Sequence, residues 1–108
     1  MTLSDSDKSA IKSEIVECLV SEEEVTRIVV FGSFVHSASP HDVDIAVFQN
    51  SGDKYLPLAL KYRRDVRPVS RQIPVDIFPV RDDVDDDPFL LEINHGEVIY
   101  DRRAAEVA

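Results

Sequence analysis

The sequence predicts a single domain of alternating helices and strands, in the order α-β-α-β-α-β-α with a small final strand. Apolar residues recur at helical spacing near the N-terminus. Three later apolar runs are short and rich in β-branched or aromatic residues, which is typical of strands. Turn-forming clusters separate the runs, and no repeat or low-complexity linker divides the 108 residues. We therefore expect one domain over 1–108, with its core at about 10–100.

The first predicted helix covers about residues 5–20. Ser4-x-x-Asp7 resembles a capping box at its start. Its apolar residues follow i, i+4, i+7, i+8 spacing and form one buried stripe: Ile11, Ile15, Cys18 and Leu19.

The next elements are expected to be short. A strand at 27–31 consists of β-branched and aromatic residues and ends at Gly32-Ser33. A short helix at about 34–37 follows, and a second strand covers about 42–48.

The second half of the chain predicts a longer helix and another strand. The helix begins near Pro57, because proline is tolerated at the first helical position, and Arg67-Pro68 should end it. The strand at 72–79 has alternating apolar residues, with Asp76 on the opposite face. Beyond it we expect an acidic loop at 81–88, a short helix at 89–95, a small strand at 98–100 and a frayed tail from 101.

Composition excludes several classes of function. The formal net charge is -9, and an acidic surface repels nucleic-acid backbone, so direct nucleic-acid binding is not expected. A single cysteine, Cys18, allows neither an internal disulfide nor a thiolate metal site. The N-terminus is polar and acidic, and no apolar run approaches membrane-spanning length. We therefore expect a soluble cytoplasmic domain.

A pair of carboxylates opens the second predicted strand. Residues two apart in a strand share a face, so Asp42 and Asp44 are expected side by side, while Val43 and Ile45 are buried behind them. Two adjacent anions repel unless a cation lies between them. Oxygen ligands of this kind favour a divalent metal, most plausibly Mg²⁺.

Two further features extend this candidate site. The backbone N–H groups at Gly32-Ser33 can approach a phosphate, because glycine has no side chain in the way. If the strand of Asp76 lies beside that of Asp44, their Cβ atoms are about 5 Å apart. Three carboxylates can then hold metal ions against a triphosphate, and Asp76 can accept the proton of an attacking hydroxyl.

Gly32-Ser33, Asp42-x-Asp44 and Asp76 together resemble the signature of the DNA polymerase β-like nucleotidyltransferase superfamily. The small size resembles its minimal nucleotidyltransferases, the MNT domains. The resemblance covers roughly residues 10–100. It implies an α+β fold with a mixed sheet flanked by helices, nucleotide phosphates at Gly32 and Ser33, magnesium at Asp42 and Asp44, and Asp76 as the third catalytic and metal-binding carboxylate.

The resemblance also implies an activity and a partner. An MNT domain transfers a nucleoside monophosphate from an NTP, here most plausibly AMP from ATP, and releases pyrophosphate. A chain of 108 residues has no room for an acceptor-binding domain, so another chain must bring the hydroxyl acceptor. Among small members that partner is a helical HEPN-type protein, which the MNT antitoxin of a toxin–antitoxin pair modifies.

Two departures from the family pattern keep alternatives open. Eight residues separate Ser33 from Asp42, fewer than usual, and His36 and Ser37 stand where members often carry Arg and Gly. They support an inactive MNT-fold module that neutralises its partner by occlusion. A regulatory nucleotide-binding domain is a third interpretation, and a homo-oligomer is compatible with the sequence.

A basic cluster lies in and after the long helix of the second half. Five basic side chains occur within eleven residues: Lys61, Arg63, Arg64, Arg67 and Arg71. They form either a solvated helix face or a contact for a triphosphate or an acidic protein partner.

Overall fold

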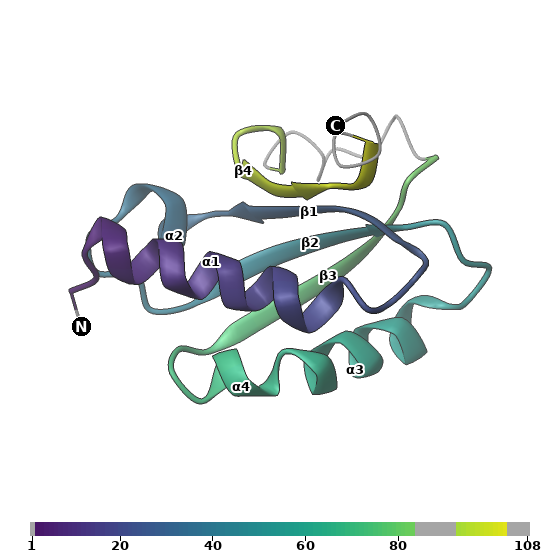
Figure 1. Ribbon diagram of the computed structural model, residues 1–108, viewed down its shortest axis with the longest axis horizontal. Coiled ribbons are helices and arrows are strands. Elements are labelled where there is room, and N and C mark those ends of the chain that lie inside the picture. Colours follow the sequence, from purple (N-terminus) through teal and green to yellow (C-terminus); the bar gives the residue numbers. More distant parts are fainter. Residues whose placement is uncertain (1, 84–92, 104–108) are drawn as a thin grey trace.

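The computed structural model describes residues 2–83 and 93–103. They form four helices and four strands, arranged as Figure 1 shows. The elements are α1 (Asp5–Leu19), β1 (Val25–Phe31), α2 (Ser33–His36), β2 (Val43–Gln49), α3 (Tyr55–Asp65), α4 (Arg67–Ser70), β3 (Val75–Arg81) and β4 (Glu97–Asp101). The capping box at the start of α1 is present, since Ser4 and Asp7 exchange side chain-to-backbone hydrogen bonds.

The four strands form one sheet in the order β3-β2-β1-β4. β1 pairs antiparallel with both β2 and β4, whereas β2 and β3 run parallel. A parallel pair needs a long crossover, and the segment containing α3 and α4 supplies it. This mixed sheet with helices confirms the predicted α+β fold class.

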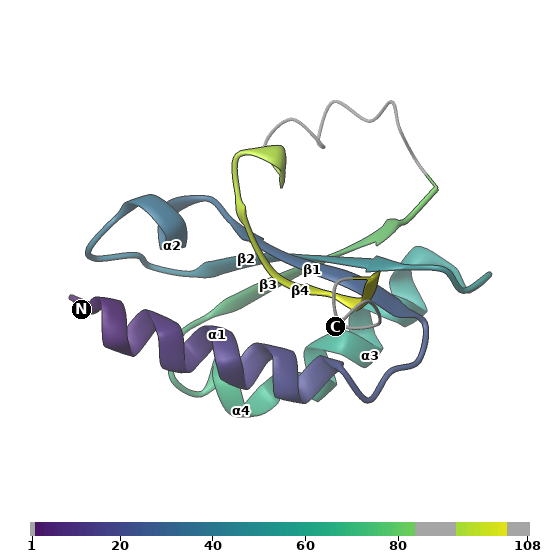
Figure 2. The ribbon, with the colours of Figure 1, turned by 45° about the horizontal axis from the view of Figure 1, so that its top comes forward.

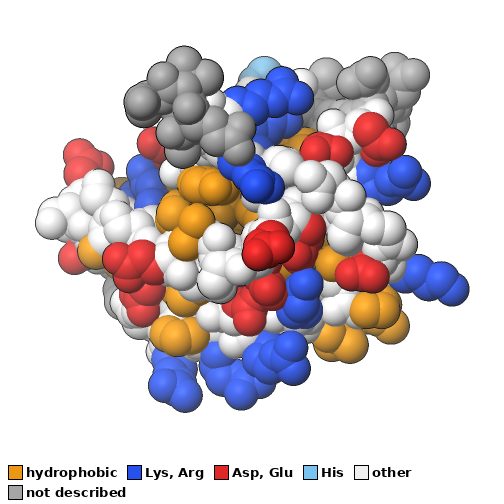
Figure 3. All heavy atoms as spheres, turned by 45° about the vertical axis from the view of Figure 1, so that its right-hand side comes forward, with side chains coloured by type: hydrophobic (Ala, Val, Ile, Leu, Met, Phe, Trp, Pro, Cys, Tyr) orange, Lys and Arg blue, Asp and Glu red, His pale blue; other side chains and the backbone are white. Residues whose placement is uncertain are grey.

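The long helices lie on one face of the sheet. Figure 2 shows α1, α3 and α4 together below the strands, with α2 beyond one end of the sheet. The outer sides of these helices reach solvent, and charged side chains of both signs cover the surface seen in Figure 3. In the described part of the chain no helix is long and apolar enough to cross a bilayer.

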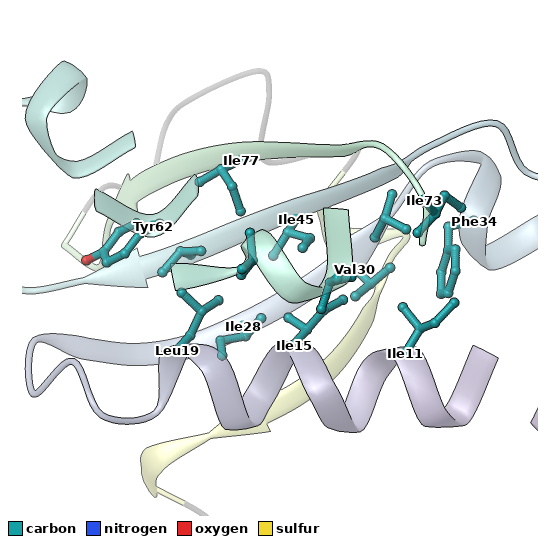
Figure 4. Close-up of a cluster of buried hydrophobic side chains, with 14 of the residues drawn as sticks. Ile11, Ile15, Leu19, Ile28, Val30, Phe34, Ile45, Tyr62, Ile73 and Ile77 are labelled. Carbon is teal, nitrogen blue, oxygen red and sulfur yellow. The ribbon is translucent and has the colours of Figure 1, made fainter. Parts of the chain in front are cut away.

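The main core fills the space between these helices and the sheet. Alternate residues of each strand point into it, as period-2 geometry requires. Figure 4 shows Ile15 and Leu19 of α1 beside Ile28 and Val30 of β1, and Ile11 of α1 directed at Phe34. Fully burying a side chain of this kind contributes about 1.5–3 kcal/mol, so the stripe predicted for α1 fixes the helix on the sheet.

Cys18 also lies where the sequence predicts. It is half-buried and packs against the main core. Burial raises the pKa of its thiol, and the nearby carboxylates act in the same direction. Cys18 is therefore a packing residue rather than a reactive thiolate.

The other face of the sheet carries a smaller apolar cluster and the polar side chains of the strands. The cluster consists of Val29, Phe31, Ala46, Phe48 and Ile93, with Phe78 and Val80 packed against it. The Phe31 and Phe78 rings lie 5.7 Å apart at a tilt of 50°. No long helix covers this face in the described residues. Asp44 and Asp76 each precede a residue of the main core, Ile45 and Ile77, so their side chains lie on this face, away from α1 and α3.

The second half differs from the prediction by one added helix and one strand boundary. Helix α3 ends at Asp65, before Arg67-Pro68 as predicted, but Pro68 then lies in the first turn of a further short helix, α4, where a missing N–H costs nothing. Strand β3 begins at Val75 rather than 72, since α4 and the turn after it occupy the intervening residues. Ile73, expected in the strand, is buried in the main core instead.

The C-terminal segment is also more ordered than predicted. Asp101 is the last residue of β4 and pairs with Arg27, and the Arg102 guanidinium donates a hydrogen bond to the Glu23 carbonyl at 2.8 Å. A frayed tail from 101 is therefore wrong for 101–103. Most of the predicted acidic loop and of the helix at 89–95 lies outside the described residues.

Candidate active site

Three carboxylates meet at the α2 end of the sheet. Asp44 of β2 and Asp76 of β3 are direct partners in the parallel ladder, so their side chains leave the same face next to each other. Asp42 precedes β2 and joins them from the connecting segment. One carboxylate oxygen from each residue lies within 4.8 Å of the others, with Asp42 and Asp44 half-buried and Asp76 exposed.

This arrangement confirms the predicted convergence with one correction. Asp42 was expected inside the strand, but β2 begins at Val43, whose backbone N–H donates to the Pro74 carbonyl at 2.9 Å. Asp42 therefore lies in the segment before β2, and the path of that segment, not strand alternation, brings it to the other two carboxylates. Alternation does place Asp44 and Asp76 away from the core, because Ile45 and Ile77 point into it.

Gly32 brings the Gly-Ser turn against the carboxylates. Its φ of +78° and ψ of -154° form a conformation that L side chains rarely adopt, and it is the N-cap residue directly before α2. A Cβ atom added there would lie 2.5 Å from Asp44 Oδ2. The backbone therefore requires glycine, and any side chain at position 32 would also have to displace the Asp44 carboxylate; exposed Ser33 follows directly.

Contacts from the N-terminal segment hold α2 and the loop after it. Fully buried Phe34 inserts α2 into the main core. The Lys8 ammonium donates to the Ser37 carbonyl at the end of α2 and lies 5.6 Å from the centre of the Phe34 ring. Leu3, itself buried, donates its backbone N–H to the Ala38 carbonyl at 2.8 Å.

Sequence reasoning missed these positioning residues. The loop from Ser37 to Asp42 leads directly into the carboxylate cluster, so what holds the loop also sets the position of Asp42. Lys8 and Ser37 are 29 residues apart, and no local spacing or motif signals a contact at that distance.

The donor set fits a hard divalent cation. Asp42, Asp44 and Asp76 offer oxygen atoms only, which suits Mg²⁺ and not a soft metal. Gly32 leaves room for Asp44 Oδ2, which lies where a Cβ atom at position 32 would stand. The three carboxylates come from β2, β3 and the segment before β2, so the sheet brings two of them together.

Two comparisons place this geometry among known proteins. The family model "Polymerase beta, Nucleotidyltransferase" matches residues 13–105, which include all five predicted site residues. Among solved structures, one match is the complex of tri-AMPylated Shewanella oneidensis HEPN toxin with MNT antitoxin, at 14% identity and a TM-score of 0.61. It covers 93% of this chain and 77% of the other.

A second structural match is the toxin–antitoxin complex MntA–HepT, at 13% identity and a TM-score of 0.59 over 92% of this chain and 77% of that one. No curated protein sequence gives a significant match. At these identities the structural likeness shows the fold alone. Because the family model spans most of its length, the chain belongs to the polymerase beta nucleotidyltransferase family.

Proposed function

We propose that this chain transfers AMP from ATP to a hydroxyl group of a HEPN-type partner protein and thereby acts as the antitoxin of a toxin–antitoxin pair. The observation that supports the proposal most is the convergence of three carboxylates beside the Gly32 turn. Family membership supports nucleotidyl transfer as the reaction class. The solved complex of an AMPylated HEPN toxin with its MNT antitoxin supports AMP as the group transferred and a HEPN-type acceptor.

The proposed reaction requires few chemical steps from the protein. The acceptor hydroxyl oxygen forms a bond to the α-phosphorus of ATP, the bond from that phosphorus to the bridging oxygen of the β-phosphate breaks, and pyrophosphate leaves. Asp76, the exposed carboxylate, takes the hydroxyl proton. The Gly32-Ser33 turn contacts the nucleotide phosphates through its backbone and the Ser33 hydroxyl.

Asp42, Asp44 and Asp76 are the proposed magnesium ligands. When bound, Mg²⁺ supplies positive charge that stabilises the negative charge developing on the transferring phosphate and on pyrophosphate. The chain holds the three carboxylates together before the nucleotide arrives. Positioning and electrostatics of this kind account for most of the catalysis in phosphoryl transfer.

The test is a direct assay of AMP transfer. Purified chain, its HEPN-type partner, ATP and Mg²⁺ should give a mass increase of one AMP or more on the partner. The double variant Asp42→Asn/Asp44→Asn should lose the transfer while keeping its fold, because relief of like-charge repulsion offsets any lost contact. Transfer at the wild-type rate by that variant would overturn the assignment of the site.

Occlusion without chemistry is the second candidate, and the local sequence favours it at one point. His36 ends the four-residue α2 and Ser37 follows it, where family members often carry Arg and Gly. A tight complex with no AMP on the partner, in the presence of ATP and Mg²⁺, would support occlusion. The same complex with an adduct would support transfer.

A further inference from the structure

The outer side of α3 combines exposed apolar and basic side chains. We call it the α3 surface and define it by five residues of α3, Tyr55, Leu56, Leu60, Arg63 and Arg64, and by Arg67, the first residue of α4. Leu56 is 63% exposed, and Tyr55 and Leu60 are each 56% exposed. In the described part of the chain only two other large apolar side chains are comparably exposed, Val20 and Val98, and neither lies on α3.

Helical spacing lines up three of these residues. Leu56, Leu60 and Arg63 follow i, i+4, i+7, so they form one ridge about 10 Å long. The opposite side of α3 is buried through Leu58, Ala59 and Tyr62. The ridge therefore faces away from the core and is free to pack against another helix.

The three arginines of the α3 surface have no acidic partner among the described residues. Lys61 is engaged, since its ammonium lies 2.7 Å from Glu24 and 3.7 Å from Glu22. Arg63, Arg64 and Arg67 are exposed and form no ion pair with any described residue. These unpaired arginines stand on a chain whose formal net charge is -9.

The position of α3 excludes one interpretation of this basic cluster. α3 covers the same face of the sheet as α1, whereas Asp44 and Asp76 leave the opposite face (Figure 2). The arginines of the α3 surface therefore lie across the sheet from the proposed nucleotide site and cannot contact the triphosphate there. A solvated helix face and a protein partner remain, and the exposed leucines beside the arginines favour the partner. Figure 3 shows basic and apolar side chains together along the lower part of that view, where α3 lies.

We propose that the α3 surface is a docking site for an acidic amphipathic helix of the partner protein, which rests on the proposed function. Apolar side chains of that helix cover Leu56 and Leu60, and its carboxylates pair with Arg63, Arg64 and Arg67. Charge complementarity selects this occupant over a second copy of the chain, because two copies at -9 each repel one another. Docking on the helix face leaves the carboxylate face uncovered, and the acceptor hydroxyl must then come from a part of the partner that extends beyond the docked helix.

The experiment measures the dissociation constant between the full chain and the HEPN-type partner by isothermal titration. Two α3 variants are compared with the wild type: Leu56→Ser/Leu60→Ser and Arg63→Glu/Arg67→Glu. Each should weaken binding at least tenfold while its thermal unfolding curve stays that of a folded protein. The matched control Val98→Ser removes an apolar side chain of similar exposure on β4 and should stay within twofold of the wild type.

Salt and a catalytic variant sharpen the result. Raising the ionic strength should weaken wild-type binding more than that of Arg63→Glu/Arg67→Glu, because the arginine contribution is screened. Asp42→Asn/Asp44→Asn should bind as tightly as the wild type and transfer no AMP. That combination separates loss of docking from loss of chemistry.

Each other outcome overturns the inference. A tight complex that both α3 variants retain would leave the proposed function intact and remove the α3 surface from it. If the wild-type chain forms no complex with the HEPN-type partner, both the partner and the docking site are refuted. This holds even if the chain hydrolyses ATP or transfers AMP to a different acceptor. A dimer of the chain alone, abolished by Leu56→Ser/Leu60→Ser in sedimentation, would assign the surface to a second copy.

Discussion

Gly32 joins the backbone geometry of the chain to the geometry of its carboxylates. Its positive φ is a conformation that side chains rarely adopt, and a Cβ atom there would also push Asp44 Oδ2 aside. We expect Gly32→Ala to lower the free energy of unfolding by about 1–3 kcal/mol, from strain alone. The displaced Asp44 should also weaken Mg²⁺ binding.

Urea denaturation with and without Mg²⁺ measures both effects. Gly52→Ala is the matched control, because a Cβ there meets nothing within 4 Å and its φ is not positive. That control should be neutral or stabilising by about 0.4–1 kcal/mol, through the unfolded chain. Equal stability of the two variants would contradict the requirement for glycine at position 32.

Lys8 is the residue-scale support of the loop before Asp42. Replacing it by Met removes the hydrogen bond to the Ser37 carbonyl and the contact with Phe34. We expect Lys8→Met to cost about 1 kcal/mol, because the contact is only partly buried, and to slow AMP transfer. Lys12→Met is the control: it breaks the more exposed Lys12–Glu97 pair and should change the transfer rate little. Equal transfer rates for the two variants would contradict a positioning role for Lys8.

At the scale of elements, the sequence predicted the site better than the boundaries. Alternation in two apolar strands was enough to place Asp44 and Asp76 on one face, and neighbouring strands then brought them together. Strand direction and the order β3-β2-β1-β4 depend on packing between distant segments, which no local pattern encodes. The same holds for Pro68, where the choice between ending one helix and starting another depends on Val69, which is buried in the core.

The connector between α1 and β1 is tied to α3 by carboxylates in two different environments. Burial would raise the pKa of Glu24, but hydrogen bonds from Lys61 and from the Tyr62 hydroxyl, each 2.7 Å long, outweigh it and lower the pKa. Glu22 behaves oppositely: a hydrogen bond shared with Asp65, and then burial, raise its pKa. Asp65 Oδ2 is buried without a fixed donor among the described residues.

These opposite shifts predict opposite effects of two similar substitutions. Glu24 has a folded pKa below its usual 4.5, so its contribution is present above pH 4.5 and is lost as the pH falls through the folded pKa. Glu24→Gln should therefore cost about 1–2 kcal/mol at pH 7 and progressively less below pH 4.5. Urea denaturation at pH 7 and pH 3 measures the difference.

Glu22→Gln is the matched variant. Because the folded pKa of Glu22 is raised, its contribution is full below pH 4.5 and is lost as the pH rises through the folded pKa. A glutamine amide stays neutral and can donate to Asp65, so this variant should gain about 0.5–1 kcal/mol at pH 7. Destabilisation by both variants at pH 7 would contradict the assignment of the two environments.

For the whole molecule, the two faces of the sheet separate stability from chemistry. The helices and the main core occupy one face, and the three carboxylates lie at the edge of the other. Substitutions at the carboxylates should therefore leave the core intact. Metal binding at the cluster can then be measured as a change in the free energy of global unfolding when the ion is added.

Magnesium binding must then appear as stabilisation of the entire fold. A ligand that binds only the folded state adds RT ln(1 + [L]/Kd), which is about 2.7 kcal/mol at a concentration one hundred times Kd. Wild-type chain should gain stability with MgCl₂ beyond what NaCl of equal ionic strength gives, and the NaCl control matters because a chain at -9 is stabilised by screening alone. Asp42→Asn/Asp44→Asn should match or exceed the wild type without Mg²⁺ and gain no more from MgCl₂ than from NaCl. An equal magnesium-specific gain in both proteins would mean that the ion binds elsewhere, and the carboxylate cluster would lose its proposed role in holding it.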